Sequence, residues 1–263
     1  MMTITNRKVA GLTPAWAPFY GFSLLFDNPG HSVAAGDAEG ELEAMACHPD
    51  EPALSFYRTF HEQSAELEQL HADYLLCPLP FHSYHVTVWD GLNVSNVNKM
   101  TAYSQEAERF VSELPGSLLT DSPFLRRTGG EAIRINVDGG IRFAYDALEN
   151  RGNSALVVNV KAADPESAER LKEVERLRSE LNAEFQERFG VTTASADYRP
   201  HVSLGYFANK ELGSQSASAL ERLDDRLRQA SEGRTVTFRS ISLYGMTDMQ
   251  TFIRKRPDNA RPQ

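Results

Sequence analysis

Two places in the sequence pair a histidine with a hydroxyl residue two positions further along. His85 is followed by Thr87, and His201 is followed by Ser203. Side chains alternate between the two faces of an extended strand, so each imidazole is expected to share a face with its hydroxyl. If the two pairs face one another, they surround one small space with two proton-transfer groups and two hydroxyl donors. Such a set is what cleavage of a phosphodiester requires when no metal ion takes part.

The chemistry of these four side chains agrees with that expectation. Histidine titrates near neutrality, so one ring can be neutral while the other is protonated. A well-placed acid or base contributes a rate factor of about 10²–10⁴, and hydroxyls stabilise charge on the non-bridging phosphate oxygens. The apolar residues that hold the polar groups on one face are Val86, Val88, Val202 and Leu204. The alternative is two unrelated strand histidines, each with a local hydrogen bond.

The elements that would position the first pair follow from hydrophobic periodicity. The expected strands cover 19–27 and 81–89, and the expected helices cover 52–76 and 97–114. Asp138-Gly139-Gly140 then predicts the turn of a hairpin between a strand that begins at 133 and another over 141–145. The segment 28–50 is rich in Gly, Ala and acidic residues. It is expected to be a loop, either a lid over a cleft or a disordered insertion.

The second half repeats this order of elements. Asp164-Pro165 predicts the start of a helix that ends at Gly190, and Leu220, Leu223 and Leu227 mark a later one. The expected strands cover 156–160, 199–207, 236–244 and 250–253. We therefore expect one domain over 1–263, with a first lobe over about 13–148 and a second over about 154–255, linked near 149–154.

The two phrases His85-Val86-Thr87-Val88 and His201-Val202-Ser203-Leu204, one in each half, resemble the paired motifs of the 2H phosphoesterase superfamily. It includes 2′-5′ RNA ligase-like proteins and cyclic nucleotide phosphodiesterases. The resemblance implies an α+β, bilobed, pseudo-twofold duplicated fold, in which two antiparallel sheets face one another across a central cleft and the helices lie outside. It also implies that His85 and His201 act as general base and general acid, and that Thr87 and Ser203 bind the phosphate.

Residues around the first pair indicate which branch of the superfamily the sequence resembles. Ser83-Tyr84 precedes His85, and Asp90-Gly91 follows its strand. The arrangement is similar to that of a little-characterised branch of the superfamily, which weakens the transfer of any particular substrate.

Five further residues are candidate substrate contacts. Arg199 lies two positions before His201 and is expected on the same face, where a guanidinium could pair with phosphate oxygens. Arg134 lies on the polar face of its strand, and for both arginines a surface ion pair is the alternative. Tyr206 and Phe207 could stack on a base, although core packing is the simpler explanation. Tyr84, beside the first pair, is the fifth candidate.

No cofactor and no metal ion are expected. The sequence has no glycine-rich phosphate loop, no carboxylate cluster and no Cys-x-x-Cys. His82 is three positions from His85 and therefore on the opposite strand face, so a metal site built from these two histidines is the weaker alternative.

Composition restricts the substrate and the setting. The formal net charge is −9 and there is no basic stripe, which argues against an extended nucleic-acid surface and favours a small nucleotide or short oligonucleotide. No apolar run is long enough to span a membrane, and the N-terminal residues lack the apolar core of a signal peptide. Two cysteines cannot staple a domain of this size, so a reduced cytoplasmic setting is expected. We expect a monomer.

The sequence thus predicts a metal-independent phosphoesterase that acts in RNA processing. It would hydrolyse a 2′,3′-cyclic phosphate or a short 2′-5′ or 3′-5′ oligonucleotide. One histidine would deprotonate the attacking water or 2′-hydroxyl and the other would protonate the leaving oxygen, and the sequence does not say which. Ligation would be the reverse reaction. The alternatives are a non-catalytic nucleotide-binding module and, more weakly, a metallohydrolase.

Overall fold

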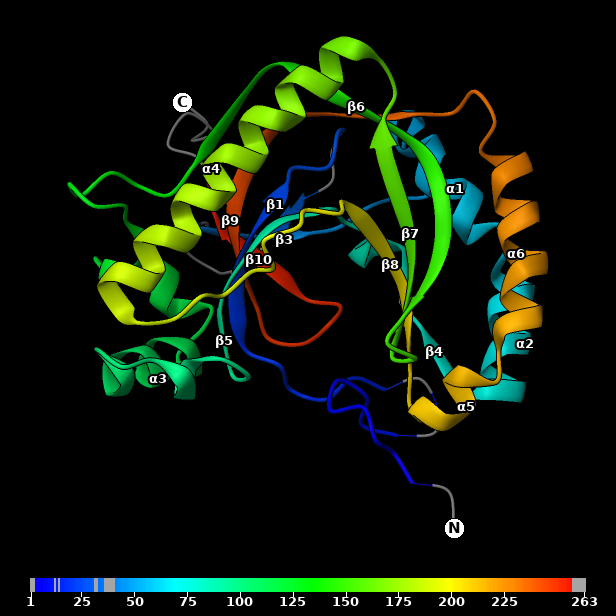
Figure 1. The fold of residues 1–263 in the computed structure, drawn as a ribbon, viewed down its shortest axis with the longest axis horizontal. Coiled ribbons are helices and arrows are strands. Elements are labelled where there is room, and N and C mark those ends of the chain that lie inside the picture. The colour runs from blue at the N-terminus through cyan, green and yellow to red at the C-terminus, as the bar shows by residue number, and fades with distance from the viewer. Residues whose placement is uncertain (1–2, 12, 14, 31–32, 36–40, 257–263) are drawn as a thin grey trace.

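A curved antiparallel sheet lies at the centre of the molecule, with helices along its outer side (Figure 1). The computed structural model describes residues 3–11, 13, 15–30, 33–35 and 41–256. The helix α4 lies on one side of the strands, and α1, α2 and α6 lie together on the other. The prediction of a mixed α+β fold built on antiparallel strands is confirmed.

Ten strands belong to this sheet within the described residues. They are β1 (Gly21–Phe26), β2 (Val33–Ala35), β3 (Leu42–Met45), β4 (Leu76–Pro78), β5 (Thr87–Asn93), β6 (Ile135–Arg151), β7 (Ala155–Ala162), β8 (His201–Phe207), β9 (Val236–Met246) and β10 (Phe252–Lys255). Their order is β2-β3-β10-β9-β6-β7-β8-β4, and β1 pairs with both β9 and β5. Every pairing is antiparallel.

The helices pack against different parts of the sheet. They are α1 (Ser55–His61), α2 (Ser64–Tyr74), α3 (Ser104–Ser112), α4 (Pro165–Phe189), α5 (Lys210–Ser214) and α6 (Ala217–Ala230). Short 3₁₀ helices cover Pro52–Leu54, Phe81–Ser83, Val97–Lys99, Gly116–Leu119 and Pro123–Leu125. The predicted ends of α4 are confirmed, because Asp164 accepts a hydrogen bond from the Ser167 amide and Gly190 ends the helix at φ 69°.

Two predicted helices are shorter than expected. The helix expected over 52–76 is divided at Glu62-Gln63, so that α1 contacts α6 and β9 while α2 contacts β4. The helix expected over 97–114 consists of a 3₁₀ turn and the nine-residue α3. A change of packing partner accompanies the interruption of the first helix. In the second, the Thr101 amide donates to the Phe189 carbonyl oxygen and Tyr103 takes a φ of 58° before α3 begins.

The prediction of a hairpin at Asp138-Gly139-Gly140 is wrong. These residues lie inside the single long strand β6, which pairs with β9 before Phe143 and with β7 after it. Against β9 the register jumps from Asn136 to Ile141, and Gly139 and Gly140 take φ values of 77° and 75° in this bulge. Glycine serves a bulge as well as a turn because both require a positive φ.

The expectation of two separate sheets is not confirmed. Strand β6 belongs to both halves of the sheet. Of residues 149–154, expected to link the lobes, 149–151 end β6 and pair with β7, and 152–154 make the turn between the two strands. An isolated antiparallel bridge between Val86 and Val202 then connects the start of β5 to β8. The pairings therefore run from β5 through β1, β9, β6, β7 and β8 and return to the residue before β5.

The segment expected to be a loop over 28–50 contains strands. In it, β2 pairs with β3, and β3 extends the sheet beyond β10. Residues 31–32 and 36–40 of this segment lie outside the described residues, so its proposed role as a lid is untested.

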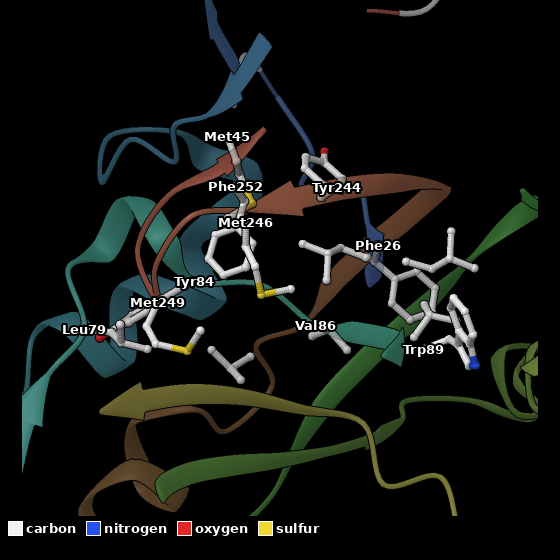
Figure 2. Packing of buried hydrophobic residues seen from close by; sticks show 14 of the residues in the cluster. Phe26, Met45, Leu79, Tyr84, Val86, Trp89, Tyr244, Met246, Met249 and Phe252 are labelled. Carbon is white, nitrogen blue, oxygen red and sulfur yellow. The ribbon is translucent and has the colours of Figure 1, made fainter. Parts of the chain in front are cut away.

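The apolar residues of the two phrases lie in the core, as predicted. Val86 and Val202 are fully buried, and Val88 and Leu204 are almost so. Figure 2 shows Val86, Phe26 and Trp89 among the buried side chains around the first phrase. None of the helices in the described part of the chain combines the length and apolar character of a membrane span.

Gly205, directly after the second phrase, lies against the backbone of β4. A Cβ atom at this position would be 2.6 Å from the Cys77 carbonyl oxygen and 3.0 Å from the Pro78 Cα. We expect Gly205→Ala to lower the free energy of unfolding by about 1–3 kcal/mol, because the strand must move to admit the methyl group. Urea denaturation measures this. Gly116→Ala is the control, since nothing lies within 4 Å of its Cβ position, and an equal loss in both variants would contradict the explanation.

Candidate functional site

The bridge between Val86 and Val202 brings the two histidine phrases together. In an antiparallel register, the residues on either side of a bridged pair face one another across the strands. This register places His85 opposite Ser203 and Thr87 opposite His201, on the face away from the buried valines. Directly opposed residues have Cβ atoms about 4.5–5.5 Å apart, so the four side chains form one cluster.

The local chain around His85 is not the plain strand that was expected. Residues 81–83 form a 3₁₀ turn, in which the Ser83 hydroxyl and amide both donate to the Pro80 carbonyl oxygen. Strand β5 begins only at Thr87. The turn places the Ser83 carbonyl beside the His85 ring, a contact that strand geometry does not predict.

All four residues line one cavity of about 370 Å³, called here the histidine cavity. Its other walls come from the N-terminal segment, β1, β5 and the loop after it, the segment between α4 and β8, β8 itself, and both sides of the turn before β10. These are Arg7, Lys8, Phe19, Ser23, Leu25, Asp90, Asn93, Ser95, Asn96, Lys99, Thr193, Tyr206, Met246, Met249 and Phe252. The cavity is therefore built from segments that lie far apart in the sequence.

His85 is held in one tautomer. Its Nδ1 lies 2.7 Å from the Ser83 carbonyl oxygen, which can only accept, so Nδ1 carries the proton and Nε2 presents a lone pair. The Phe252 ring packs against the imidazole, with 4.3 Å between the ring centroids. Burial, with a smaller contribution from the charge of Lys8, lowers the pKa of His85 to about 4 although the Ser83 contact opposes the shift. The ring is therefore neutral at pH 7.

His201 lies between a guanidinium and a carbonyl. Its Nδ1 is 2.8 Å from Arg151 Nη1 and 2.9 Å from the Arg199 carbonyl oxygen, and its Nε2 is 3.3 Å from the same Arg151 nitrogen. Arginine only donates, so a neutral ring can accept its hydrogen bond but a protonated ring cannot. Burial and this neighbouring charge lower the pKa of His201 to about 4.

Arg151 is itself held by polar side chains. Its Nε lies 3.1 Å from a Glu149 carboxylate oxygen, and its Nη2 donates to Asn159 Oδ1 at 2.6 Å. Asn159 in turn donates to Glu149 at 2.8 Å. The guanidinium beside His201 is thus fixed by the end of β6 and by β7.

The two hydroxyls are available to a ligand. Thr87 and Ser203 are half-buried, and neither hydroxyl has a hydrogen-bond partner among the described residues. Two further cavity hydroxyls, those of Ser95 and Thr193, are buried without a partner in this part of the chain. The backbone of Thr87, unlike its hydroxyl, has a hydrogen-bond partner: the Tyr198 hydroxyl donates to the Thr87 carbonyl oxygen at 2.9 Å.

Cations and aromatic rings occur together in the histidine cavity. The Lys8 ammonium lies 4.5 Å from the Tyr206 ring centroid and 5.2 Å from that of Phe19, and it donates to the Tyr206 hydroxyl at 3.3 Å. The N-terminal segment is held there by Asn6, whose amide donates to the carbonyl oxygens of Ser154 and Phe207. Arg7 and Lys99 add positive charge, and Asp90 is the carboxylate of the wall. The local balance is positive although the whole chain is acidic.

The five candidate contacts have different positions. Tyr206 lines the histidine cavity, whereas Tyr84 and Phe207 are buried in the core, with Tyr84 packed on Tyr57 and Phe81. Arg134 is exposed and lies outside this cavity. Arg199 is 66% exposed, pairs with Glu149 at 3.4 Å, and lines a second pocket that adjoins the first.

His82 is not part of the cluster. Its side chain is exposed and does not line the histidine cavity, so it does not share a site with His85. Among the described residues there is no group of three or more His, Cys, Asp and Glu side chains arranged to hold a metal ion.

Because both histidines have a lowered pKa, stability should depend on pH. An unfolded histidine titrates at 6.5 and the folded ones at about 4, so between these values the unfolded chain binds more protons. The stabilisation is complete above about pH 6.5 and is lost as the pH falls towards 4, with a slope of up to about 1.4 kcal/mol per pH unit for each histidine. Urea denaturation at pH 5 and pH 7 measures the difference.

Variants of single histidines show which residues cause this pH dependence of stability. His85→Gln and His201→Gln should each make the pH dependence shallower, whereas His48→Gln, at an exposed position, should leave it as it is. A slope that is the same in all four proteins would contradict the stated burial of the two rings.

Comparison with known proteins adds information on the fold. No family model and no curated protein matches the sequence. A conserved protein of unknown function from Agrobacterium tumefaciens is 14% identical, with a TM-score of 0.50 over 94% of this chain and 89% of that one. Two structures of Usb1 from Kluyveromyces marxianus, one with uridine monophosphate, are 13% and 12% identical. Their TM-scores are 0.36 and 0.35, with coverage of 91% and 94% of this chain and 98% and 100% of theirs. The Agrobacterium protein supports the fold alone, and the Usb1 scores are too low to carry an argument.

Proposed function

We propose that the protein is a phosphoesterase that needs no metal ion and acts through His85 and His201. Its substrates are 2′,3′-cyclic phosphates or short 2′-5′ or 3′-5′ oligonucleotides, and ligation is the reverse reaction. The observation that carries this proposal is the antiparallel bridge between Val86 and Val202, which gives both histidine–hydroxyl pairs one shared face. In this proposal a monomer binds a small substrate between its two lobes.

The proposed mechanism begins with both rings neutral. A phosphate between them favours protonation of one ring, because an anion stabilises the charged form. Both rings have a backbone carbonyl at Nδ1, that of Ser83 for His85 and that of Arg199 for His201, so Arg151 is the group that distinguishes them. Arg151 keeps His201 unprotonated before the reaction, as a base must be, so His201 is the better candidate for the base and His85 for the acid. His201 takes the proton of the attacking water or 2′-hydroxyl, and His85 gives one to the leaving oxygen.

The other polar groups of the cavity are suited to stabilise the phosphate. The hydroxyls of Thr87 and Ser203 donate to the non-bridging oxygens, on which charge increases in the transition state. Lys8 adds a positive charge at the same wall. The rings of Tyr206 and Phe19 lie against the Lys8 ammonium and support its position at this wall.

Turnover in the presence of a chelator tests the proposal. Purified protein is incubated with adenosine 2′,3′-cyclic phosphate and with 2′-5′ and 3′-5′ diadenosine monophosphates, with and without EDTA. Cleavage of at least one of them at an unchanged rate in EDTA is expected. Binding of the nucleotides without turnover would indicate a non-catalytic binding module, and loss of activity in EDTA would indicate a metallohydrolase.

Salt dependence tests the expected size of the substrate. Each neutralised phosphate adds about 0.7 to the slope of log affinity against log salt for single strands, so a slope of about one to two is expected for a short ligand. Lys8→Met should lower the slope by about one such step. Affinity for a labelled trinucleotide and for a long labelled single strand, each at several salt concentrations, measures this. A steep slope would show that a long nucleic acid is the ligand.

A further inference from the structure

Arg178 is a buried charge without an ionic partner. It lies on α4 and is only 5% exposed. No carboxylate lies within 4.0 Å of its guanidinium among the described residues. Its Nη1 donates to the Ala196 carbonyl oxygen at 3.3 Å, and its Nε is buried with no partner in the described chain. Burying an ion is costly unless it is paired, so this arrangement requires an explanation.

The pocket beside Arg178 supplies an explanation for this buried charge. Arg178 lines a pocket of about 140 Å³, called here the arginine pocket, together with Arg151 and Arg199. Thr87, Asp90 and His201 line both this pocket and the histidine cavity. The two spaces therefore adjoin at the reaction centre, on the side where His201 meets Arg151.

The charges of the arginine pocket are incompletely matched. Arg151 and Arg199 both pair with Glu149, which is not among the residues that line the pocket. The carboxylates that do line it, Asp90 and Asp197, lie outside ion-pair distance of Arg178. A bound anion would supply the missing partner.

We propose that the arginine pocket binds a second phosphate of the substrate, next to the phosphate that is cleaved. Guanidinium groups match phosphate oxygens in geometry as well as charge, and three of them line a space of this size. The preferred substrate is then a nucleotide with at least two phosphates, such as an oligonucleotide, and a cyclic mononucleotide is a poor one. This inference rests on the proposed function.

A purely structural role for Arg178 makes a different prediction. The guanidinium lies 5.1 Å from the Tyr198 ring centroid, and the Tyr198 hydroxyl holds the Thr87 carbonyl. If Arg178 only supports Tyr198, its loss should impair every substrate to the same extent. If it binds a phosphate, its loss should impair only those substrates that carry the second phosphate.

The experiment compares matched substrates. The first set is adenosine 2′,3′-cyclic phosphate, its 5′-phosphorylated form and the dinucleotide ApA with a 2′,3′-cyclic end. The second phosphate is absent from the first of these, a monoester in the second and a diester in the third. The second set is ApA with and without a 3′-terminal phosphate, which places the extra group on the other side. We expect a higher kcat/KM for the member with more phosphates in at least one set. Arg178→Met should reduce that preference by about tenfold or more, as expected for a lost hydrogen bond to a charged group.

Arg188→Met is the matched control. Arg188 lies on the same helix and also stacks on a ring, that of Phe189, with 4.7 Å to the centroid, but it does not line the arginine pocket. The control should keep the preference of the unmodified protein. Equal loss on all substrates in Arg178→Met, or no preference in the unmodified protein, would overturn the inference.

A binding measurement separates this inference from the proposed function. Calorimetry compares adenosine 3′,5′-bisphosphate with adenosine 3′-monophosphate and with adenosine 5′-monophosphate. Tighter binding of the bisphosphate than of either monophosphate, lost in Arg178→Met, supports the second phosphate site even if no diester is cleaved. Equal affinities together with active cleavage would overturn the site and leave the phosphoesterase proposal intact.

Discussion

Replacing His85 or His201 with alanine is expected to lower turnover by about 100-fold or more, because each removes a group that transfers a proton in the transition state. The two losses should not multiply in the double variant. Once one proton-transfer group is missing, the other cannot complete a concerted exchange. Initial rates on the best diester at pH 7 measure the effect.

The control for this prediction is His82→Ala. His82 lies three positions from His85 but is exposed and outside the histidine cavity, so its loss should leave the rate within a factor of about two. A folded His201→Ala protein with undiminished turnover would contradict the assignment. An equal loss in His82→Ala would favour a metal site at the two neighbouring histidines.

Removing the hydroxyls is expected to have the second largest effect. Thr87→Val and Ser203→Ala each delete one hydrogen bond to a charged oxygen, worth about 1.5–3 kcal/mol, which corresponds to a loss of about 10- to 150-fold in kcat/KM. The loss should appear mainly in kcat, because the bonds strengthen as charge builds on the phosphate oxygens.

Variants that keep the hydroxyl provide the control. Thr87→Ser and Ser203→Thr retain the donor and change only a methyl group, so they should recover most of the activity. If these exchanges are as harmful as Thr87→Val and Ser203→Ala, the positions act through packing and not through hydrogen bonds.

Strand parity made the four central residues predictable. The alternation of His85 and Thr87 with Val86 and Val88 fixes which side chains enter the core, and the buried valines confirm it. The capping residues of α4 were equally predictable, because Asp164 and Gly190 act within a few residues of themselves. These signals are local, and local signals can be read from a single chain.

The turn at Gly139-Gly140 illustrates why other parts could not be predicted. A positive φ suits both a hairpin and a bulge, and only the pairing of β6 with β9 decides between them. The same holds for the number of sheets, which depends on one long strand shared by both halves and on a single bridge at Val86.

The charged groups around the site were missed for a related reason. Lys8 reaches the cavity only because the N-terminal segment docks beside β8, and Arg151 meets His201 through the pairing of β6, β7 and β8. Arg178 reads in the sequence as one more polar position of a long helix. No spacing rule connects residues so far apart, so their contribution becomes visible only in the fold.

Imidazole ¹⁵N NMR during titration with adenosine 3′-monophosphate tests most directly whether both histidines serve one phosphate. We predict that the ring nitrogens of His85 and His201 shift with a single common affinity and a stoichiometry of one. One of the rings should take up a proton as the phosphate binds, while His82 is unaffected. A ligand that moves only one of the two rings, or that moves them with different affinities, would contradict a shared site and with it the two-histidine mechanism.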